Sequence, residues 1–316
     1  MNACDAAHGT GRIEMSNVEL RSLLSGITGL IRFDEPMSRY TSFRIGGPAD
    51  AYVEPADVQS LQHLMARAAD EEVPVFVMGG TNLLVRDGGI QGIVVRLVKL
   101  DRIEEEPEPG ILYAEGGVLM PRLLKWAMKR GLTGLEFAAG IPGTVAGCVV
   151  MNAGTRFGEM KEVVRKIRLV TMTGAIVDVS AAQAEYSYRR SQLPQGVVVG
   201  AWLGLQPGAK ARIEASVKDS LYRRKATQPI EMPNAGCVFK NPAGDSAGRL
   251  IEAAGLKGAR IGDAQISTKH ANFIVNRGHA TAADTEALIR LVGKTVADKF
   301  GMILDLEVQI VGRELV

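Results

Sequence analysis

Two glycine-rich segments constrain the fold of this chain more than any other feature of its sequence. Gly79–Asn82 (GGTN) follows the apolar run Val75–Met78, and Gly140–Gly147 (GIPGTVAG) lies further along the chain. A glycine-rich turn after a strand can bring main-chain N–H groups close to a phosphate. Neither segment matches GxGxxG and the chain has no GxxxxGK(S/T), so a Rossmann dinucleotide site and a P-loop are both disfavoured. The alternative is that these glycines only make tight turns, and spacing alone does not decide between the two.

Composition and charge narrow the class of protein. With 316 residues, 46% of them apolar and 23% charged, the chain is typical of a globular protein of two or three domains. The 37 basic and 35 acidic residues nearly cancel, so no general nucleic-acid-binding signal exists and any anion site must be local. Cys4, Cys148 and Cys237 are widely spaced and the four histidines form no HxxxH pattern. We therefore expect neither a disulfide framework nor a metal.

The distribution of apolar residues indicates where in the cell the protein is expected. No apolar run approaches 18 residues, so no membrane span is expected. The N-terminal segment is polar and lacks the apolar middle of a signal peptide, and we interpret residues 1–17 as a disordered tail. These features predict a cytoplasmic protein.

Hydrophobic spacing and turn residues predict a chain in which helices and strands are mixed. Helical patterns cover residues 18–32, 57–71, 118–130, 210–225, 246–254 and 282–299, and Asp57 is the expected cap of the second. Runs typical of strands cover residues 75–78, 83–85, 93–97, 111–114, 197–205, 272–276 and 303–311. Residues 163–179 are typical of a hairpin that turns at Thr173-Gly174, whereas 134–154 does not fit a long helix. Because strands gather in the middle third, an α+β fold is favoured over a doubly wound sheet.

Six short segments carry a resemblance to one enzyme family. They are Tyr40–Ala49 (YTSFRIGGPA), Gly79–Leu84 (GGTNLL), Gly140–Thr144 (GIPGT), Tyr188–Ser191 (YRRS), Asn234–Pro242 (NAGCVFKNP) and Leu306–Gly312 (LEVQIVG). In this order they resemble the UDP-N-acetylenolpyruvoylglucosamine reductases of bacterial peptidoglycan synthesis, over about residues 20–313. The chain runs directly from Asn152–Gly154 to Thr155–Phe157, so it resembles the type that lacks a tyrosine loop over the substrate.

The resemblance implies a fold and a domain organisation. The fold would be α+β, with a two-part FAD-binding region of the vanillyl-alcohol-oxidase (PCMH) type and a C-terminal α+β substrate-binding domain. We expect the two FAD-binding subdomains to cover residues 18–85 and 86–208, and the substrate-binding domain to cover 209–316, with Pro207-Gly208 at the boundary. The expected protein is a monomer that works in cell-wall synthesis, and so in cell shape and division, without a nucleic-acid or membrane partner.

The resemblance also implies a reaction and its contacts. NADPH would reduce FAD, and hydride from the flavin N5 would then reduce UDP-N-acetylenolpyruvoylglucosamine to UDP-N-acetylmuramate. The implied cofactor contacts are Arg44, Gly79, Gly80, Thr81, Asn82, Leu83, Gly140, Ile141, Gly143, Thr144, Gly147 and Val199. The implied substrate contacts are Tyr188, Lys225, Asn241 and His270, although Lys225 could serve NADPH instead. A solvated helix end would also account for Lys225, and a structural role for His270.

Arg189 and Glu307 are the residues that the resemblance assigns to charge stabilisation. Negative charge builds up on the substrate carboxylate as the alkene is reduced, and a guanidinium can meet a carboxylate in bidentate fashion. The residues alone favour a solvated basic turn at Tyr188–Ser191, and only the resemblance favours a catalytic Arg189. Alternation along Ile303–Val311 predicts that Glu307 faces solvent, opposite an apolar face of Leu304, Leu306, Val308 and Ile310. The resemblance instead points Glu307 into the site, as an acid whose pKa burial would raise.

Cys237 departs from the family pattern. Most members have serine here, as the proton donor to the enol intermediate. An unperturbed thiol has a pKa of about 8.5, so it gives up a proton more readily than a hydroxyl but cannot do so as thiolate. We therefore predict a rate that falls above roughly pH 8. A small buried hydrophobe is the alternative role for this residue.

Two other functions stay open on the residues alone. One is an FAD-dependent oxidase or dehydrogenase of the same flavin-binding fold, in which Cys148 would be a distant candidate for tethering FAD. The other is a non-enzymatic nucleotide-binding module. A yellow purified protein and substrate-dependent oxidation of NADPH would separate both from the reductase.

Overall fold

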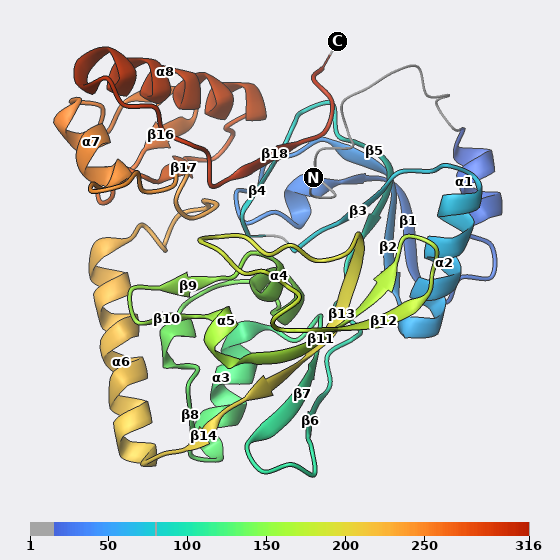
Figure 1. The fold of residues 1–316 in the computed structure, drawn as a ribbon. Helices are drawn as coiled ribbons and strands as arrows, with labels where there is room; N and C mark the ends of the chain where they lie inside the picture. Colours follow the sequence, from blue (N-terminus) through green and yellow to red (C-terminus); the bar gives the residue numbers. More distant parts are fainter. Residues whose placement is uncertain (1–15, 80, 316) are drawn as a thin grey trace. The chain divides into compact units, whose positions relative to one another are not determined.

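The computed structural model describes residues 16–79 and 81–315, and Figure 1 shows their fold. These residues group into two compact units. Of the residues that the structure describes, the first unit comprises 16–33, Ala51–Gly79 and Gly92–Tyr222, and the second comprises Asp34–Asp50, 81–91 and 223–315. The chain therefore passes between the units several times, and segments far apart in the sequence belong to the same unit.

The first unit contains most of a four-stranded sheet and the whole of a five-stranded sheet. The four-stranded sheet has the order β1 (Gly29–Pro36), β2 (Pro48–Pro55), β5 (Ile90–Val95), β3 (Val75–Val77), and β3 runs parallel to β5. The five-stranded sheet has the order β12 (Ile176–Ser180), β11 (Val164–Thr171), β13 (Gly196–Gly204), β7 (Ile111–Glu115), β6 (Ile103–Glu105), and its neighbours are all antiparallel. Two short antiparallel pairs join β8 (Leu132–Thr133) to β14 (Gln206–Pro207) and β9 (Gly154–Thr155) to β10 (Gly158–Glu159).

Several helices accompany the strands of the first unit. They are α1 (Asn17–Leu23), α2 (Val58–Asp70), α3 (Met120–Lys129), α4 (Val145–Val150) and α5 (Met160–Val163), with a 3-10 turn η3 at Glu136–Ala138. The carboxylate of Asp57 accepts the N–H of Ser60 at 2.7 Å and so caps α2, as predicted. Leu61, Leu64 and Met65 repeat at helical spacing and are almost completely buried, which attaches one face of α2 to the core.

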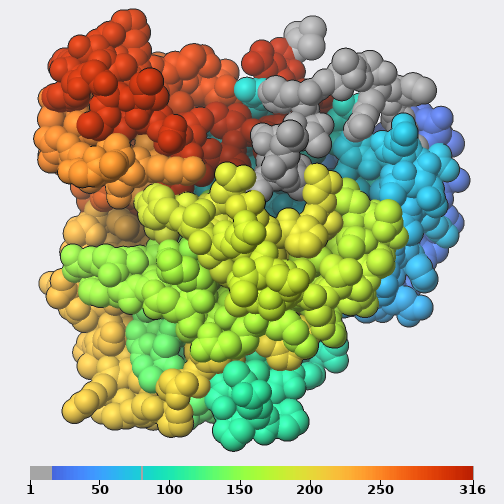
Figure 2. All heavy atoms as spheres, viewed as in Figure 1, coloured from blue at the N-terminus to red at the C-terminus, as the bar shows by residue number. Residues whose placement is uncertain are grey.

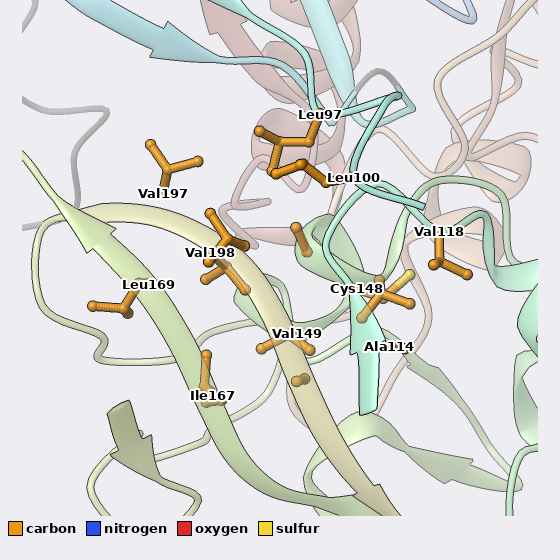
Figure 3. Close-up of a cluster of buried hydrophobic side chains, with 14 of the residues drawn as sticks. Leu97, Leu100, Ala114, Val118, Cys148, Val149, Ile167, Leu169, Val197 and Val198 are labelled. Atoms are coloured by element: carbon orange, nitrogen blue, oxygen red, sulfur yellow. The ribbon is translucent and has the colours of Figure 1, made fainter. Parts of the chain in front are cut away.

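The core of the first unit joins α4 to the five-stranded sheet. Figure 3 shows part of it, a cluster of buried side chains from β7, β11, β13, α4 and the loops around them: Leu97, Leu100, Ala114, Val118, Cys148, Val149, Ile167, Leu169, Val197 and Val198. Helix α4 packs against β13 and β7. Buried apolar area stabilises by about 25 cal/mol per Å². The position of α4, and of the glycine-rich segment in front of it, is therefore set by apolar packing.

The second unit combines helices with two small sheets. Helices α7 (Ala247–Ala253) and α8 (Ala282–Phe300) contact each other, and α8 packs on the antiparallel sheet β15 (Arg260–Ile261), β16 (Ala264–Ile266), β17 (Ile274–Asn276) (Figure 1). Strand β4 (Leu83–Val85) pairs in parallel with β18 (Gln309–Val311). The carboxylate of Asp87, just after β4, accepts the N–H groups of Ala282 and Ala283 at 2.9 and 3.1 Å. These bonds tie β4 to the start of α8. A 3-10 turn, η2 (Met37–Arg39), also belongs to this unit.

Helix α6 (Lys210–Thr227) carries the chain from the first unit into the last segment of the second unit, which begins at Arg223. In the described part of the chain, no helix is long and apolar enough to cross a membrane.

Most predicted elements are confirmed. The helices predicted over 57–71, 118–130, 210–225, 246–254 and 282–299 correspond to α2, α3, α6, α7 and α8. The hairpin over 163–179 is β11 and β12, with Gly174 in the left-handed region at φ 84°. The α+β class is also confirmed. The predicted division at 18–85, 86–208 and 209–316 concerns function and stays a prediction.

Two predicted elements are wrong in part. The helix expected over 18–32 ends at Leu23, because Gly26 and Gly29 adopt positive φ angles of 78° and 139° and turn the chain into β1. The expected strand 303–311 shrinks to β18, since Leu306 makes only an isolated bridge to Phe239. Residues 16 and 17, expected in the disordered tail, cap and begin α1. The rest of that tail, with Cys4, lies outside the described residues.

Candidate active site

The two glycine-rich segments meet in the first unit. A Cβ built on Gly79 would lie 3.7 Å from the Cα of Gly147, and one built on Gly147 would lie 3.8 Å from the Cα of Gly79. Gly79 is exposed, so bare main chain faces outward at this approach. Spacing along the sequence left open whether these glycines only make turns. Their approach favours a surface on which a phosphate group can reach the backbone.

Left-handed glycines shape the second segment. Gly140 and Gly143 have φ angles of 78° and 104°, which side chains rarely adopt. The carbonyl of Gly143 accepts the N–H of Met120 at 3.0 Å. Thr144 then caps α4, since its Oγ1 accepts the N–H of Gly147 at 3.3 Å. The glycines bend the chain and the threonine starts the helix that carries Gly147.

The main chain of Val199 is connected by hydrogen bonds to the start of α4, next to the second glycine-rich segment. Its side chain is fully buried, but its carbonyl accepts the N–H of Gly116 at 2.7 Å. The carbonyl of Gly116 in turn accepts the N–H of Ala146 at 2.9 Å. Only glycine fits at position 116, because a Cβ there would lie 2.5 Å from the carbonyl oxygen of Val198. Strand β13 is therefore linked through Gly116 to the start of α4, and any cofactor contact of Val199 would use main-chain atoms.

Arg189 occupies a closed and strained turn. The N–H of Ser187 donates to the carbonyl of Arg190 at 2.9 Å, and the reverse bond measures 3.2 Å. Arg189 has a φ of 55°, a conformation that costs a non-glycine residue about 1 to 3 kcal/mol. Its Nη2 donates to the carbonyl of Gly154 at 2.9 Å, and its guanidinium carbon lies 5.0 Å from the ring centroid of Tyr188. This half-buried, anchored guanidinium does not fit a simple solvated turn. Its part of the chain lies at the surface in Figure 2 (yellow-green).

The second unit brings Glu307, Asn82 and the segment of Cys237 together. The N–H of Glu307 donates to the carbonyl of Val238 at 2.8 Å. The carbonyl of Glu307 accepts Nδ2 of Asn82 at 2.7 Å. Ser42 adds a bond from its Oγ to the carbonyl of Thr81 at 3.1 Å. Thr81, Asn82, Glu307 and Cys237, which are widely separated in the sequence, thus lie on adjacent stretches of backbone.

The exposure predicted by alternation at Glu307 is wrong. Leu306, expected to be buried, is 38% exposed, whereas Glu307 is partly buried. The reason is that 303–308 does not form a regular strand: Glu307 and Val308 both donate to the carbonyl of Val238, so strict alternation is lost.

Arg224 is a charged neighbour of Cys237 that the sequence analysis did not single out. Burial lowers the pKa of Arg224, and its interaction with the Cys237 thiolate opposes that shift. Lys225, the residue predicted from this cluster, is exposed. Helical spacing carried the missing signal, since Arg224 follows the buried Val217 by two turns and so shares its face.

The weaker candidates have local structural partners. The carbonyl of Lys225 accepts Nζ of Lys269 at 2.6 Å, and Oδ1 of Asn241 accepts the N–H of Ala247 at 3.1 Å, at the start of α7. Nδ1 of His270 accepts the N–H of Asn272 at 3.2 Å, and burial lowers the pKa of His270. Arg44 is exposed, with a φ of 56°.

Three predicted cofactor contacts remain. Leu83 is buried in β4, Ile141 is partly buried, and Gly80 lies outside the described residues.

Cys148 does not suit a tether for a flavin. Its side chain lies inside the core in Figure 3, and burial raises the pKa of its thiol to about 12. Among the described residues, no three His, Cys, Asp or Glu side chains are grouped so that they could hold a metal ion.

Comparison with known proteins identifies the family. Residues 49–180 match an FAD binding domain, and residues 228–311 match the C-terminal domain of UDP-N-acetylenolpyruvoylglucosamine reductase. UDP-N-acetylenolpyruvoylglucosamine reductase 2 of Symbiobacterium thermophilum is 46% identical over 297 residues, or 93% of this chain and 96% of that protein. This chain belongs to the UDP-N-acetylenolpyruvoylglucosamine reductase family. The Clostridium novyi reductase is 43% identical over 88% of this chain and 91% of its own length.

Solved structures agree with the reductase family. The crystal structure of the reductase from Thermus caldophilus is 36% identical, with a TM-score of 0.77, and the match covers 90% of this chain and 99% of that one. A variant of berberine bridge enzyme, 18% identical, matches 62% of this chain and 44% of its own with a TM-score of 0.50, and shows a shared fold only. The predicted resemblance and the predicted FAD-binding fold are both confirmed.

FAD fits the residues of the first unit. The FAD binding domain match over residues 49–180 contains both Gly79 and the segment Gly140–Gly147. The bare main chain at Gly79 and Gly147 is a surface that a Cβ would fill. We expect the pyrophosphate of FAD to be held there by main-chain N–H groups.

This assignment predicts that Gly147→Ala weakens FAD binding without unfolding the protein. The added methyl would lie 3.7 Å from Oγ1 of Thr144 and 3.8 Å from the Cα of Gly79, which are ordinary contacts. It would crowd only the cofactor, at a cost of about 1 to 3 kcal/mol. Fluorescence titration of apoprotein with FAD gives the dissociation constant. Gly293→Ala in α8, where nothing lies within 4 Å of the new Cβ, is the matched control. Unchanged FAD affinity in Gly147→Ala would remove Gly147 from the cofactor site.

Proposed function

We propose that this protein reduces UDP-N-acetylenolpyruvoylglucosamine to UDP-N-acetylmuramate, with NADPH as the reductant. Membership of the reductase family supports this activity, and the glycine surface at Gly79 and Gly147 supports the cofactor it needs. Bound FAD would accept hydride from NADPH and deliver it to the alkene of the substrate. The activity belongs to the synthesis of peptidoglycan, and we propose that it takes place in the cytoplasm, with the protein as a monomer.

Arg189 is proposed to stabilise the charge that develops on the substrate. Addition of hydride to the terminal alkene carbon leaves negative charge on the carbon that bears the carboxylate. That charge spreads onto the carboxylate as an enolate, and a fixed guanidinium would lower its energy. The bond from Nη2 to the carbonyl of Gly154 and the closed turn at Ser187–Arg190 hold the side chain before substrate arrives. Such preorganisation is what makes a charged group effective in a transition state.

Cys237 and Glu307 are proposed to complete the chemistry. The Cys237 thiol would donate its proton to the enolate carbon, which completes the reduction of the double bond. The main-chain N–H of Glu307 donates to the carbonyl of Val238, the residue that follows Cys237. From this position Glu307 would assist in stabilising the enolate. Tyr188, Lys225, Asn241 and His270 are proposed substrate contacts, and Lys225 could serve NADPH instead.

An absorption experiment tests the proposal. The purified protein should be yellow, NADPH should bleach the flavin band, and UDP-N-acetylenolpyruvoylglucosamine should restore it without oxygen. An oxidase of the same fold would instead recover its colour only when oxygen is admitted. A colourless protein that does not take up FAD would exclude both enzymes and favour a nucleotide-binding module.

A further inference from the structure

Three asparagine side chains are buried in the part of the chain that the structure describes: Asn152, Asn272 and Asn276. A buried amide destabilises a protein unless its donor and acceptor groups are engaged. All three engage both ends of the amide. All three also donate Nδ2 to a main-chain carbonyl within two residues of a proposed site residue, and this shared pattern carries the inference.

Asn152 holds the turn of Arg189 in the first unit. Its Nδ2 donates to the carbonyl of Ser187 at 3.0 Å and to Oε2 of Glu159 at 3.0 Å. Its Oδ1 accepts the N–H of Lys161 at 3.0 Å. The residue is completely buried and has a φ of 43°, a left-handed conformation that asparagine tolerates better than most residues. One side chain thus connects the turn of Arg189 to β10 and α5.

Asn272 makes the equivalent contact beside Cys237 in the second unit. Its Nδ2 donates to the carbonyl of Phe239 at 2.8 Å, and its Oδ1 accepts the N–H of the same residue at 3.0 Å. Its own carbonyl accepts the N–H of Val238 at 2.9 Å. A side-chain amide here pairs with both polar groups of one residue, as a neighbouring strand would. The segment that follows Cys237 is thereby held on the side opposite to Glu307's bond with Val238.

Asn276 makes the third contact, beside Arg44. Its Nδ2 donates to the carbonyl of Phe43 at 3.0 Å. Its Oδ1 accepts the N–H groups of Gly278 and Ala280 at 2.8 and 3.1 Å. Arg44 follows Phe43 directly and has the left-handed φ of 56°. The amide therefore fixes the residue that leads into a strained backbone position.

We propose that Asn152, Asn272 and Asn276 are positioning residues, which set the backbone that carries Arg189, Cys237 and Arg44. The inference rests on the proposed function, because it gives these three residues their roles. The carbonyls concerned lie outside the regular strands, and that of Ser187 also accepts the N–H of Arg190 within its own turn. A rigid amide supplies a side-chain donor to each, and small displacements of a catalytic group have large effects on rate.

Asn152→Asp tests the inference most directly. Aspartate keeps the shape and the acceptor for Lys161 but loses both donors, so the carbonyl of Ser187 loses its bond from Asn152 and keeps the N–H of Arg190. We expect kcat for the enolpyruvyl substrate to fall roughly 10- to 100-fold. Reduction of the flavin by NADPH, followed by stopped-flow absorbance, should keep its wild-type rate because Arg189 is proposed to act only on the enolpyruvyl substrate.

A double-mutant cycle separates positioning from general structural damage. If Asn152 acts through Arg189, Asn152→Asp should cost nothing further in kcat once Arg189 is alanine. Asn276→Asp is the matched control, since it makes the same chemical change at another buried asparagine. Any change that Asn276→Asp causes in kcat should be the same in the wild-type background and in the Arg189→Ala background. Its main effect should be a weaker affinity for FAD.

Two results would overturn the inference. One is an Asn152→Asp protein with wild-type kcat, and the other is a loss of equal size in both backgrounds. If aspartate next to Glu159 prevents folding, Asn152→Asp combined with Glu159→Gln removes the like charges and still removes the side-chain donor to the Ser187 carbonyl, so the same cycle can be run. Failure of the proposed function itself would appear differently, as a wild-type protein whose reduced flavin does not respond to the enolpyruvyl substrate.

Discussion

Arg189→Ala is expected to lower kcat for the enolpyruvyl substrate by about 100- to 1,000-fold, the usual effect of removing one group that stabilises a developing oxyanion. Reduction of FAD by NADPH should proceed as in the wild type, because the guanidinium is proposed to act on the substrate carboxylate alone. Single-turnover measurements of the two half-reactions, followed at the flavin absorption band, separate these effects.

Arg190→Ala is the matched control for that experiment. Arg190 is exposed, and its part in the turn is made by its main-chain N–H and carbonyl groups, which alanine keeps. It should therefore retain wild-type kcat. If Arg189→Ala turned over as fast as Arg190→Ala, the role assigned to Arg189 would be wrong, and its guanidinium would serve only to fasten the turn to Gly154.

The second prediction concerns the proton supplied by Cys237. Cys237→Ala should lower kcat by about 100- to 10,000-fold, the usual contribution of a general acid. Cys237→Ser should remain active, because a hydroxyl can supply the same proton. Serine and alanine both remove the sulfur, so both variants lose its packing. Only alanine also removes the proton donor, so the difference in kcat between the two variants measures the contribution of the proton.

The pH dependence of kcat gives an independent measurement. An unperturbed thiol has a pKa of about 8.5, and above its pKa the thiolate has no proton to donate. The wild-type rate should therefore fall above roughly pH 8, whereas the serine variant should show no such fall. Arg224 lies close enough to interact with Cys237, and a cation favours the thiolate. We expect Arg224→Met to move the alkaline fall to higher pH.

Cys148 provides the control for the pH profile of Cys237. Cys148→Ala removes the other described thiol, which is buried in the core with a pKa raised to about 12, and should leave the pH profile unchanged. A Cys237→Ser protein with the same alkaline fall as the wild type would assign that fall to another group and would count against Cys237 as the donor.

Local sequence patterns were enough to predict many of the elements. Apolar spacing and the Asp57 cap predicted α2 to within one residue at each end, because both signals come from residues close in the chain. The motif segments predicted the family and its FAD-binding fold. Prediction failed over residues 24–32, where helical spacing continued through Gly26 and Gly29, whose positive φ angles turn the chain into a strand. It also failed at Glu307, because alternation holds only within a regular strand.

The amino-acid sequence by itself determined which residue types could do chemistry here: the glycines, the arginine turn, the thiol in place of serine. Only the tertiary structure decided which of them meet or are buried. The approach of Gly79 to Gly147 and the bond from Asn152 to the Ser187 carbonyl each join segments that local pattern does not relate. Backbone propensity depends on near neighbours, whereas burial and hydrogen-bond partners depend on packing between distant segments.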